Sequence, residues 1–372
     1  SPTLLSLVFA LALLLNLAVK LWLATRQMRH VARHRDLVPA PFAASVSIES
    51  HRKAADYTLA KGRFGLLTTA FGAAVLLAWT LLGGLDALNA VVRDAVQPRW
   101  GDMAYQLALV AAFVLIGGLL ELPFDLYGTF RIEQRFGFNR TTWRLFVADL
   151  AKGVAIGAVI GLPLLALILW IMRAAGPGWW WWAWCAWAGF NLLIMVIYPT
   201  VIAPMFNTFE PLSDPVLESR VKALMQRCGF AAKGLFVMDG SRRSAHGNAY
   251  FTGLGAAKRV VFFDTLLAKL SPGEVEAVLA HELGHFRHRH VQQRIVVMFA
   301  LSFLGLALLG WLAGQSGFYR GLGVSPNLAA SNDALALLLF LMVVPVFGFF
   351  ISPLSALLSR RHEFQADAYA CA

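Results

Sequence analysis

The sequence has 372 residues, of which 58% are hydrophobic and 14% are charged, with a mean hydropathy of +0.63. Soluble domains carry about 25% charged residues, so this composition excludes an ordinary soluble protein, a disordered chain and a collagen-like chain. The formal net charge is +11, and the three cysteines have no paired spacing that would indicate a disulfide framework or a thiolate metal site.

Seven apolar stretches are long enough to cross a bilayer as helices, which takes about 20 residues. They predict a mainly α-helical, polytopic membrane protein. Because the chain begins with Ser1 rather than Met and stops at Ala372, we expect it to be a fragment of a longer protein. The stretches run roughly from Leu4 to Thr25, Phe64 to Leu85, Ala104 to Leu122, Gly153 to Met172, Trp179 to Thr200, Ile295 to Gly314 and Ala334 to Leu358.

Basic residues alternate between rich and poor connections along these seven stretches. The connections after the first and third stretches are rich in arginine, whereas those after the second, fourth and sixth hold one or two basic residues. The positive-inside rule therefore predicts that the N-terminus is outside and the C-terminus is cytosolic. Bases that face an anionic leaflet explain the net charge without a nucleic-acid partner. The Arg-rich composition favours a bacterial cytoplasmic membrane, with the endoplasmic reticulum as the eukaryotic equivalent.

A single long polar segment, residues 201–294, interrupts the apolar pattern on the cytosolic side. Asp214 and Pro215 begin a helix, three strand-like runs follow at 234–238, 248–253 and 259–264, and Ser271 with Glu274 forms a capping box for a second helix. This predicts a small α+β module. The expected organisation is a membrane domain with five spans (1–200), the cytosolic module (201–294), spans six and seven (295–358), and a cytosolic helix (359–372).

The capped helix contains the run His281-Glu282-Leu283-Gly284-His285. Residues four apart share a helix face, so both imidazoles can bind one zinc ion per chain. Glu282 lies beside the metal, where a carboxylate can take a proton from zinc-activated water and pass it to the leaving amine. The pattern therefore predicts a zinc metallopeptidase with Glu282 as the general base.

The third ligand must come from a distant part of the chain. A metzincin would have Gly at position 288 and His at 291, but the sequence has His288 and Val291. A carboxylate after the last apolar stretch remains. Glu363 and Asp367 are four residues apart and share a helix face, so one of them can bind the metal while the other accepts the second N–H of a ligand histidine.

Four stretches together resemble the type I CAAX prenyl proteases, which are integral-membrane zinc metallopeptidases of the gluzincin kind. The resemblance covers almost the whole chain, including the seven apolar stretches. The four stretches are Pro123 to Glu133 with Gly137 to Asn139, Tyr198-Pro199 with Ile202 to Phe206, Asn248 to Gly253, and His281 to His285 with Glu363 to Asp367.

The resemblance implies seven helices around a large intramembrane chamber, with the catalytic module on its cytosolic side. It implies that His281, His285 and Glu363 are zinc ligands and that Asp367 orients a ligand histidine. It also implies that the strand from Asn248 and Ala249 binds an extended substrate by edge addition, with His246 as a further candidate for the cleft. Members of this family continue beyond the Glu363–Asp367 motif with a His and an Arg that stabilise the tetrahedral intermediate.

Several alternatives remain open at this point. The substrate is either a prenylated CAAX-type peptide, which loses its last three residues, or a non-prenylated membrane-associated peptide in a surveillance role. Asn248 is equally well explained as a turn residue before a strand. A seven-span transporter with a structural metal and a non-catalytic peptide-binding relative are the alternatives outside enzymology, but a transporter gives no reason for the glutamate beside the histidine pair.

Overall fold

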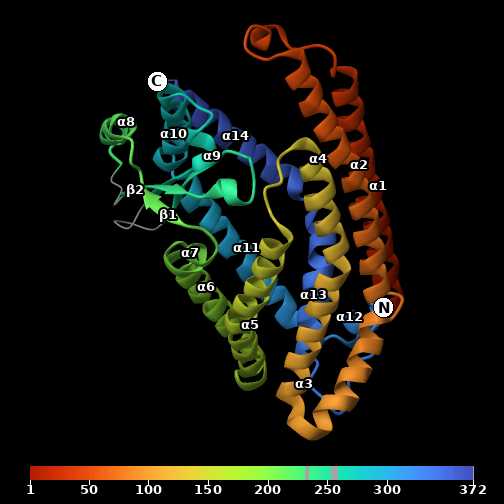
Figure 1. The fold of residues 1–372 in the computed structure, drawn as a ribbon. Coiled ribbons are helices and arrows are strands. Elements are labelled where there is room, and N and C mark those ends of the chain that lie inside the picture. Colours follow the sequence, from red (N-terminus) through yellow and green to blue (C-terminus); the bar gives the residue numbers. More distant parts are fainter. Residues whose placement is uncertain (231–233, 253–258, 372) are drawn as a thin grey trace. The chain divides into compact units, whose positions relative to one another are not determined.

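The computed structural model describes residues 1–230, 234–252 and 259–371 of this mainly helical chain (Figure 1). The chain divides into two compact units, and both are assembled from separate segments of the sequence. Unit 1 comprises Ser1–Phe136, Leu165–Trp179 and Leu308–Ser352, and unit 2 comprises Gly137–Leu164, Trp180–Ala307 and Pro353–Ala372.

Long apolar helices confirm the expected polytopic membrane architecture. Within the described residues, six helices are long and apolar enough to span a bilayer, and a bent pair of helices makes a seventh if it counts as one span. The long helices are α1 (Pro2–Arg33), α2 (Ile48–Trp79), α3 (Gly84–Tyr127), α5 (Trp143–Ala174), α6 (Trp179–Ile197), α11 (His290–Leu312), α13 (Asp333–Gly348) and α14 (Ser352–Ala370).

Short elements connect these helices, and two of them are π-helical. The π-helices are η2 (Gly128–Glu133), which continues α3, and η4 (Tyr198–Ile202), which continues α6. The remaining short elements are η1 (Ala40–Phe42), α4 (Gln134–Phe136), η3 (Gly176–Gly178), α7 (Ala203–Phe206), η5 (Gly240–Arg242), α9 (Asp264–Leu267) and α12 (Ser316–Gly321).

Helix boundaries differ from the expected spans at two places. The seventh apolar stretch is not one straight span, because α13 ends at Gly348 and α14 begins at Ser352 with a bend of 67°. Pro345, which has no N–H for the helix ladder, lies just before this break. The connection expected after the second stretch is helical from Gly84, and α3 is broken only at Gly101, where φ is 81° and ψ is 176°.

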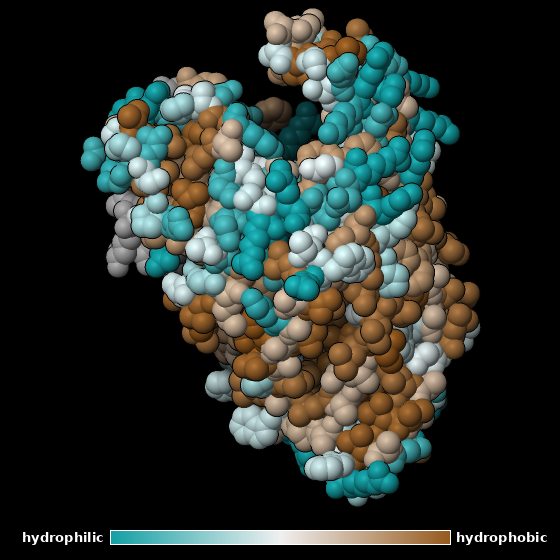
Figure 2. Space-filling model, in the orientation of Figure 1, coloured by the Kyte–Doolittle hydropathy of each residue, from teal (hydrophilic) through white to brown (hydrophobic). Residues whose placement is uncertain are grey.

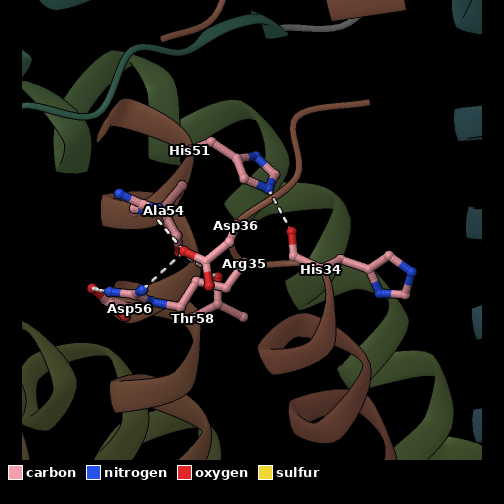
Figure 3. Close-up of polar contacts among 8 residues, drawn as sticks. His34, Arg35, Asp36, His51, Ala54, Asp56 and Thr58 are labelled. Carbon is pink, nitrogen blue, oxygen red and sulfur yellow. Dashed lines mark hydrogen bonds and ion pairs between the residues drawn. The ribbon is translucent and has the colours of Figure 1, made fainter. Parts of the chain in front are cut away.

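The basic end of unit 1 is held by ion pairs between α2 and the chain that follows α1 (Figure 3). Arg35 binds the Asp56 carboxylate through two contacts of 2.7 and 2.9 Å, and Arg52 contacts Asp36 at 2.6 Å. Figure 2 shows hydrophilic residues around this end, with hydrophobic residues along the helices away from it. Exposed leucines along α1 and α3, such as Leu11 and Leu119, are the surface expected of helices in contact with lipid.

Unit 2 contains a four-stranded mixed sheet in the order β1-β2-β4-β3. The central strands β2 (Gly234–Met238) and β4 (Arg259–Phe263) are parallel, and β3 (Ala249–Thr252) pairs with β4 in antiparallel fashion at the edge. All three expected strands are thus present, although Gly253 lies outside the described residues. The sequence analysis missed β1 (Phe209–Pro211), which pairs with β2.

Helices α8 (Pro215–Arg227) and α10 (Pro272–Arg287) pack with the sheet around one hydrophobic core. Both begin at the expected caps: Asp214 accepts from the backbone N–H of Val216 at 2.9 Å, and Ser271 forms the capping box with Glu274. The core contains Val221 from α8, Val260 and Phe262 from β4, and Val275, Leu279 and Leu283 from α10. One face of α10 is therefore fixed in the core.

Candidate metal centre

Helix α10 carries two histidines whose side chains approach each other at a common point on one face of the helix. Leu279 and Leu283 are about 1% exposed in the core, which fixes the rotation of the helix. His281 and His285, one turn apart, are only partly buried, and their Nε2 atoms lie 3.2 Å from each other. The sheet and α8 therefore position the histidine pair by holding the opposite face of the same helix.

Helix α14 supplies the third group at this point, and Gly284 allows it to come close. A Cβ at Gly284 would lie 2.9 Å from the Cα of Ala366 and 3.0 Å from its carbonyl oxygen, so only glycine fits without a shift. Ala366 is itself fully buried. With the helices in this contact, a Glu363 carboxylate oxygen lies 3.4 Å from His281 Nε2 and 3.5 Å from His285 Nε2.

These three atoms have the spacing that a tetrahedral zinc site requires. Ligand atoms about 2.0–2.2 Å from zinc, at tetrahedral angles, lie roughly 3.3–3.6 Å from one another. The observed separations of 3.2, 3.4 and 3.5 Å agree with that spacing. The donor set, two imidazoles and one carboxylate, matches that of a catalytic zinc site, which keeps its fourth position open. These side chains therefore fit a zinc ion.

A hydrogen bond holds His281 in the tautomer that a metal ligand needs. His281 Nδ1 lies 2.8 Å from Asp367 Oδ1. A carboxylate only accepts, so Nδ1 carries the proton and Nε2 keeps its lone pair directed at the metal point. The structure thus brings together all four expected members of the centre, with Glu363 among the ligand atoms and Asp367 behind a histidine.

His285 is held by two residues that the sequence analysis did not assign. Its Nδ1 lies 3.0 Å from His290 Nδ1, and His290 Nε2 lies 2.9 Å from Gln365 Oε1. Because the amide oxygen accepts, His290 carries its proton on Nε2 and accepts from His285 at Nδ1. His285 is left with a free Nε2 lone pair. The buried ring of His362 stacks on His290 at 3.9 Å and 11°, which fixes the plane of that ring.

A local break in the backbone explains why His290 can reach His285. In a continuous helix these two residues, five apart, would point away from each other. Arg289 instead adopts φ 57°, so the chain turns between α10 and α11. In the sequence, only their closeness to Glu363 on one helix indicated that Gln365 and His362 belong to the centre. This signal is weak when the helix that they contact is not known.

Glu282 lies next to the centre and is half-buried. Burial is the main cause that raises the pKa of its carboxyl; the Glu363 charge raises it further, while His281 lowers it. A bound divalent cation would oppose this shift. Burial also lowers the pKa of His285, which keeps this imidazole neutral as a ligand must be. The centre therefore combines neutral donors with a desolvated proton acceptor.

The expected substrate residues lie at the start of edge strand β3. Asn248 is exposed, and its side-chain oxygen accepts from the N–H of Ala249 at 2.9 Å. Ala249 has its methyl group buried in the core. His246 is exposed and stacks on Phe138 at 4.2 Å.

The register of β3 shows which of its backbone groups are available. Asn248 accepts from the N–H of Phe263 at 2.9 Å, so Asn248, Tyr250 and Thr252 direct their backbone groups to β4. Ala249 and Phe251 therefore direct their carbonyls to the outer edge of the sheet. Ala249 can contribute to binding through its backbone, although its side chain is buried.

Comparison with known proteins gives the same picture over both parts of the chain. Residues 27–208 match the family described as CAAX prenyl protease N-terminal, five membrane helices, and residues 211–372 match peptidase family M48. CAAX prenyl protease 1 of Saccharomyces cerevisiae is 31% identical over 94% of this chain and 81% of its own length. The homolog from Oryza sativa is 32% identical, with 91% and 81% covered. The crystal structure of S. mikatae Ste24p aligns with a TM-score of 0.87 at 29% identity, covering 98% of this chain and 88% of that one. The chain therefore belongs to the CAAX prenyl protease 1 family, the Ste24-type membrane zinc metallopeptidases of family M48.

Proposed function

We propose that one zinc ion per chain, bound by His281, His285 and Glu363, serves to remove the C-terminal tripeptide of prenylated CAAX-type peptides. The observation that carries the proposal is the tetrahedral spacing of the three ligand atoms, 3.2–3.5 Å apart, with Glu282 on the same helix. Asp367 and His290 support this assignment, because each holds one ligand imidazole with Nε2 free for the metal.

In the proposed reaction, zinc supplies Lewis acidity toward the scissile carbonyl and makes water easier to deprotonate. Glu282 takes a proton from the attacking water and later delivers it to the leaving amine. Burial raises the pKa of the half-buried Glu282 carboxyl and a bound cation opposes that shift, so it is the position of this carboxyl beside the centre that supports both steps. Asp367 and the His290–Gln365 pair keep the ligand rings from rotating.

The substrate peptide is proposed to add to the outer edge of β3 as a further strand. The carbonyl of Ala249 and the backbone groups of Phe251 are available there, because it is the backbone groups of Asn248, Tyr250 and Thr252 that face β4. Backbone pairing gives affinity with little dependence on the peptide sequence. Asn248, exposed at the start of the strand, is proposed to donate to the substrate through its amide, and His246 to line the cleft.

We further propose an orientation with the N-terminus outside and the catalytic module in the cytosol, in a bacterial cytoplasmic membrane or in the endoplasmic reticulum of a eukaryote. The alternation of basic connections supports it. In this arrangement residues 201–294 and 359–372 form the cytosolic catalytic part, and residues 1–200 and 295–358 the membrane part. The bilayer and the peptide are the expected partners, without nucleic acid.

Purified protein in liposomes is expected to cleave a farnesylated peptide after its cysteine, and zinc chelation is expected to abolish the cleavage. Re-addition of stoichiometric zinc should restore it. The measurement is release of a fluorogenic C-terminal tripeptide, with the unfarnesylated peptide as the matched substrate. A preparation that contains no zinc and still cleaves would contradict the proposal.

Equal rates on the two peptides would instead support the second candidate, a surveillance peptidase for non-prenylated membrane proteins. The edge of β3 favours this candidate in one respect, because backbone pairing makes no contact with a prenyl group. The ratio of the two kcat/KM values therefore decides between the substrates without affecting the assignment of the zinc centre.

Replacing His290 with Phe is expected to weaken zinc binding about 10- to 100-fold, the usual cost of losing a group that orients a ligand. The ring volume is kept, but His285 Nδ1 loses its acceptor. Zinc affinity of the metal-free protein can be measured by competition with a chromogenic chelator. The comparison variant is His288→Phe. The exposed His288 ring stacks on His290 at 5.5 Å, whereas the hydrogen bond with His285 is made by His290, so only His290→Phe removes that bond. Equal affinities in the two variants would show that His290 has no orienting role.

A further inference from the structure

A groove of about 930 Å³ lies within unit 1, between α2 and the end of α3 with its π-helical continuation η2. Its apolar wall includes Phe64 and Leu67 from α2 and Phe124 and Tyr127 from α3. The Phe64 ring lies 6.1 Å from that of Phe124 and 5.1 Å from that of Tyr127. The volume falls in the range of small-molecule sites, roughly 300–1,000 Å³.

Three arginines line the same groove: Arg63 from α2, Arg131 from η2 and Arg135 from α4. All three are exposed, and the lining includes no acidic residue. None of the three forms an ion pair within the part of the chain that the structure describes. Other bases at this end are paired with acids: Arg35 binds Asp56 (Figure 3), and Arg52 binds Asp36. The groove therefore carries three positive charges beside an aromatic wall; of these, Arg135 is also close enough to Asp56 to add to the effect of Arg35, which lowers the pKa of that carboxyl.

We propose that this groove binds one anionic glycerophospholipid, with the phosphate among Arg63, Arg131 and Arg135 and an acyl chain along Phe64, Phe124 and Tyr127. Guanidinium groups bind phosphate through paired N–H donors, so they fix the headgroup. Both α2 and α3 are long and apolar enough to span a membrane. Along these helices the aromatic lining is followed by the arginine lining, and a ligand with an apolar chain and an anionic head has the same order.

The walls of the groove distinguish a lipid from a peptide occupant. The apolar wall is formed by α2 and α3, whose backbone amides are bonded within the helices. An extended peptide would find no backbone partners along it, whereas a lipid acyl chain needs none. The outer edge of β3, in unit 2, is where the chain offers backbone groups to a peptide. The groove is thus proposed as a lipid site separate in kind from the peptide site.

The test uses the full chain, delipidated in detergent and titrated with phosphatidylglycerol or phosphatidylcholine while bound lipid is counted by native mass spectrometry. One phosphatidylglycerol per chain is expected to bind preferentially. Each arginine near an anionic headgroup contributes a factor of about 5, so the triple variant R63Q/R131Q/R135Q should bind phosphatidylglycerol about 100-fold more weakly. The variant with three lysines should retain most of the affinity.

A control variant removes the same charge elsewhere in unit 1. Arg26, Arg29 and Arg33 are exposed on α1, outside the groove, and R26Q/R29Q/R33Q is expected to keep the phosphatidylglycerol site. An equal loss in this variant would overturn the proposal, because affinity would then follow total charge. If the groove triple variant fails to fold, R63Q and R131Q singly are each expected to lose about 5-fold.

Two competition experiments test the occupant. Inorganic phosphate should displace phosphatidylglycerol only weakly, since it makes no contact with the aromatic wall. Displacement at equal concentration would show a plain anion site and overturn the lipid assignment. A farnesylated CAAX peptide should leave the lipid bound. One-for-one displacement by that peptide would also overturn the proposal, because the groove would then belong to the substrate.

Discussion

Replacing Glu282 with Gln is expected to lower the turnover of a farnesylated peptide by about 10²- to 10⁴-fold, the contribution typical of a positioned general base. Glutamine has nearly the same shape but cannot take the proton of the attacking water. Glu282 is not among the three atoms at tetrahedral spacing, which come from His281, His285 and Glu363. Zinc content should therefore remain at one ion per chain, measured by atomic emission on the same preparation that is assayed.

The matched comparison for Glu282→Gln is Glu276→Gln, on the same helix. Glu276 forms an ion pair with Arg220 at 2.7 Å on the surface of the module. Exposed pairs of this kind contribute little stability, so we expect turnover close to that of the parent protein. If Glu282→Gln kept full turnover with zinc bound, another group would have to act as the base. If it lost its zinc, a structural role would explain the effect.

Replacing Gly284 with Ala is expected to impair the centre without touching any proposed ligand. The added methyl group would meet the backbone of Ala366 at 2.9–3.0 Å, so α14 must move away from α10. A shift of this kind in a packed contact typically costs about 1–3 kcal/mol. Because Glu363 and Asp367 are both on α14, the shift also moves the third ligand and the partner of His281.

Zinc affinity is the direct measurement for this variant, and it should fall by about 5- to 100-fold, since 1.4 kcal/mol corresponds to a factor of ten. Gly273→Ala is the matched control: it lies in the same helix, and a Cβ there meets nothing within 4 Å. Both variants make the same chemical change, and helix propensity favours alanine more in the helix interior at Gly284 than in the first turn at Gly273, so a loss in Gly284→Ala would not be an effect of propensity. Unchanged zinc affinity in Gly284→Ala would show that the helices can adjust without moving Glu363.

Local signals allowed much of the fold to be predicted. The caps at Asp214 and Ser271 act within three residues, and the sequence alone therefore located the starts of α8 and α10. The length of the apolar stretches located the spanning helices, because a helix needs about 20 apolar residues to cross the hydrocarbon core. It did not find the break between α13 and α14, since hydropathy reports which residues are apolar and not the direction of the backbone. The three-residue strand β1 was too short to show alternation.

The candidate centre was predictable where its members follow helix spacing. His281 and His285 are four residues apart, as are Glu363 and Asp367. The two pairs could be joined because a zinc site with two histidines needs a third ligand. His290 was not predictable in the same way, because its contact with His285 depends on the positive φ of Arg289. A non-glycine residue in that conformation has no reliable signature in a single sequence.

The metal centre also determines when the chain can become active during synthesis. His281 and Asp367 are 86 positions apart, and the intervening chain includes α11 and α13. A ribosome that has just completed α10 has therefore made the histidine pair and the base, but neither the third ligand nor the acceptor behind His281. The hydrolytic centre can close only after two further apolar helices have been translated and α14 has come back against Gly284.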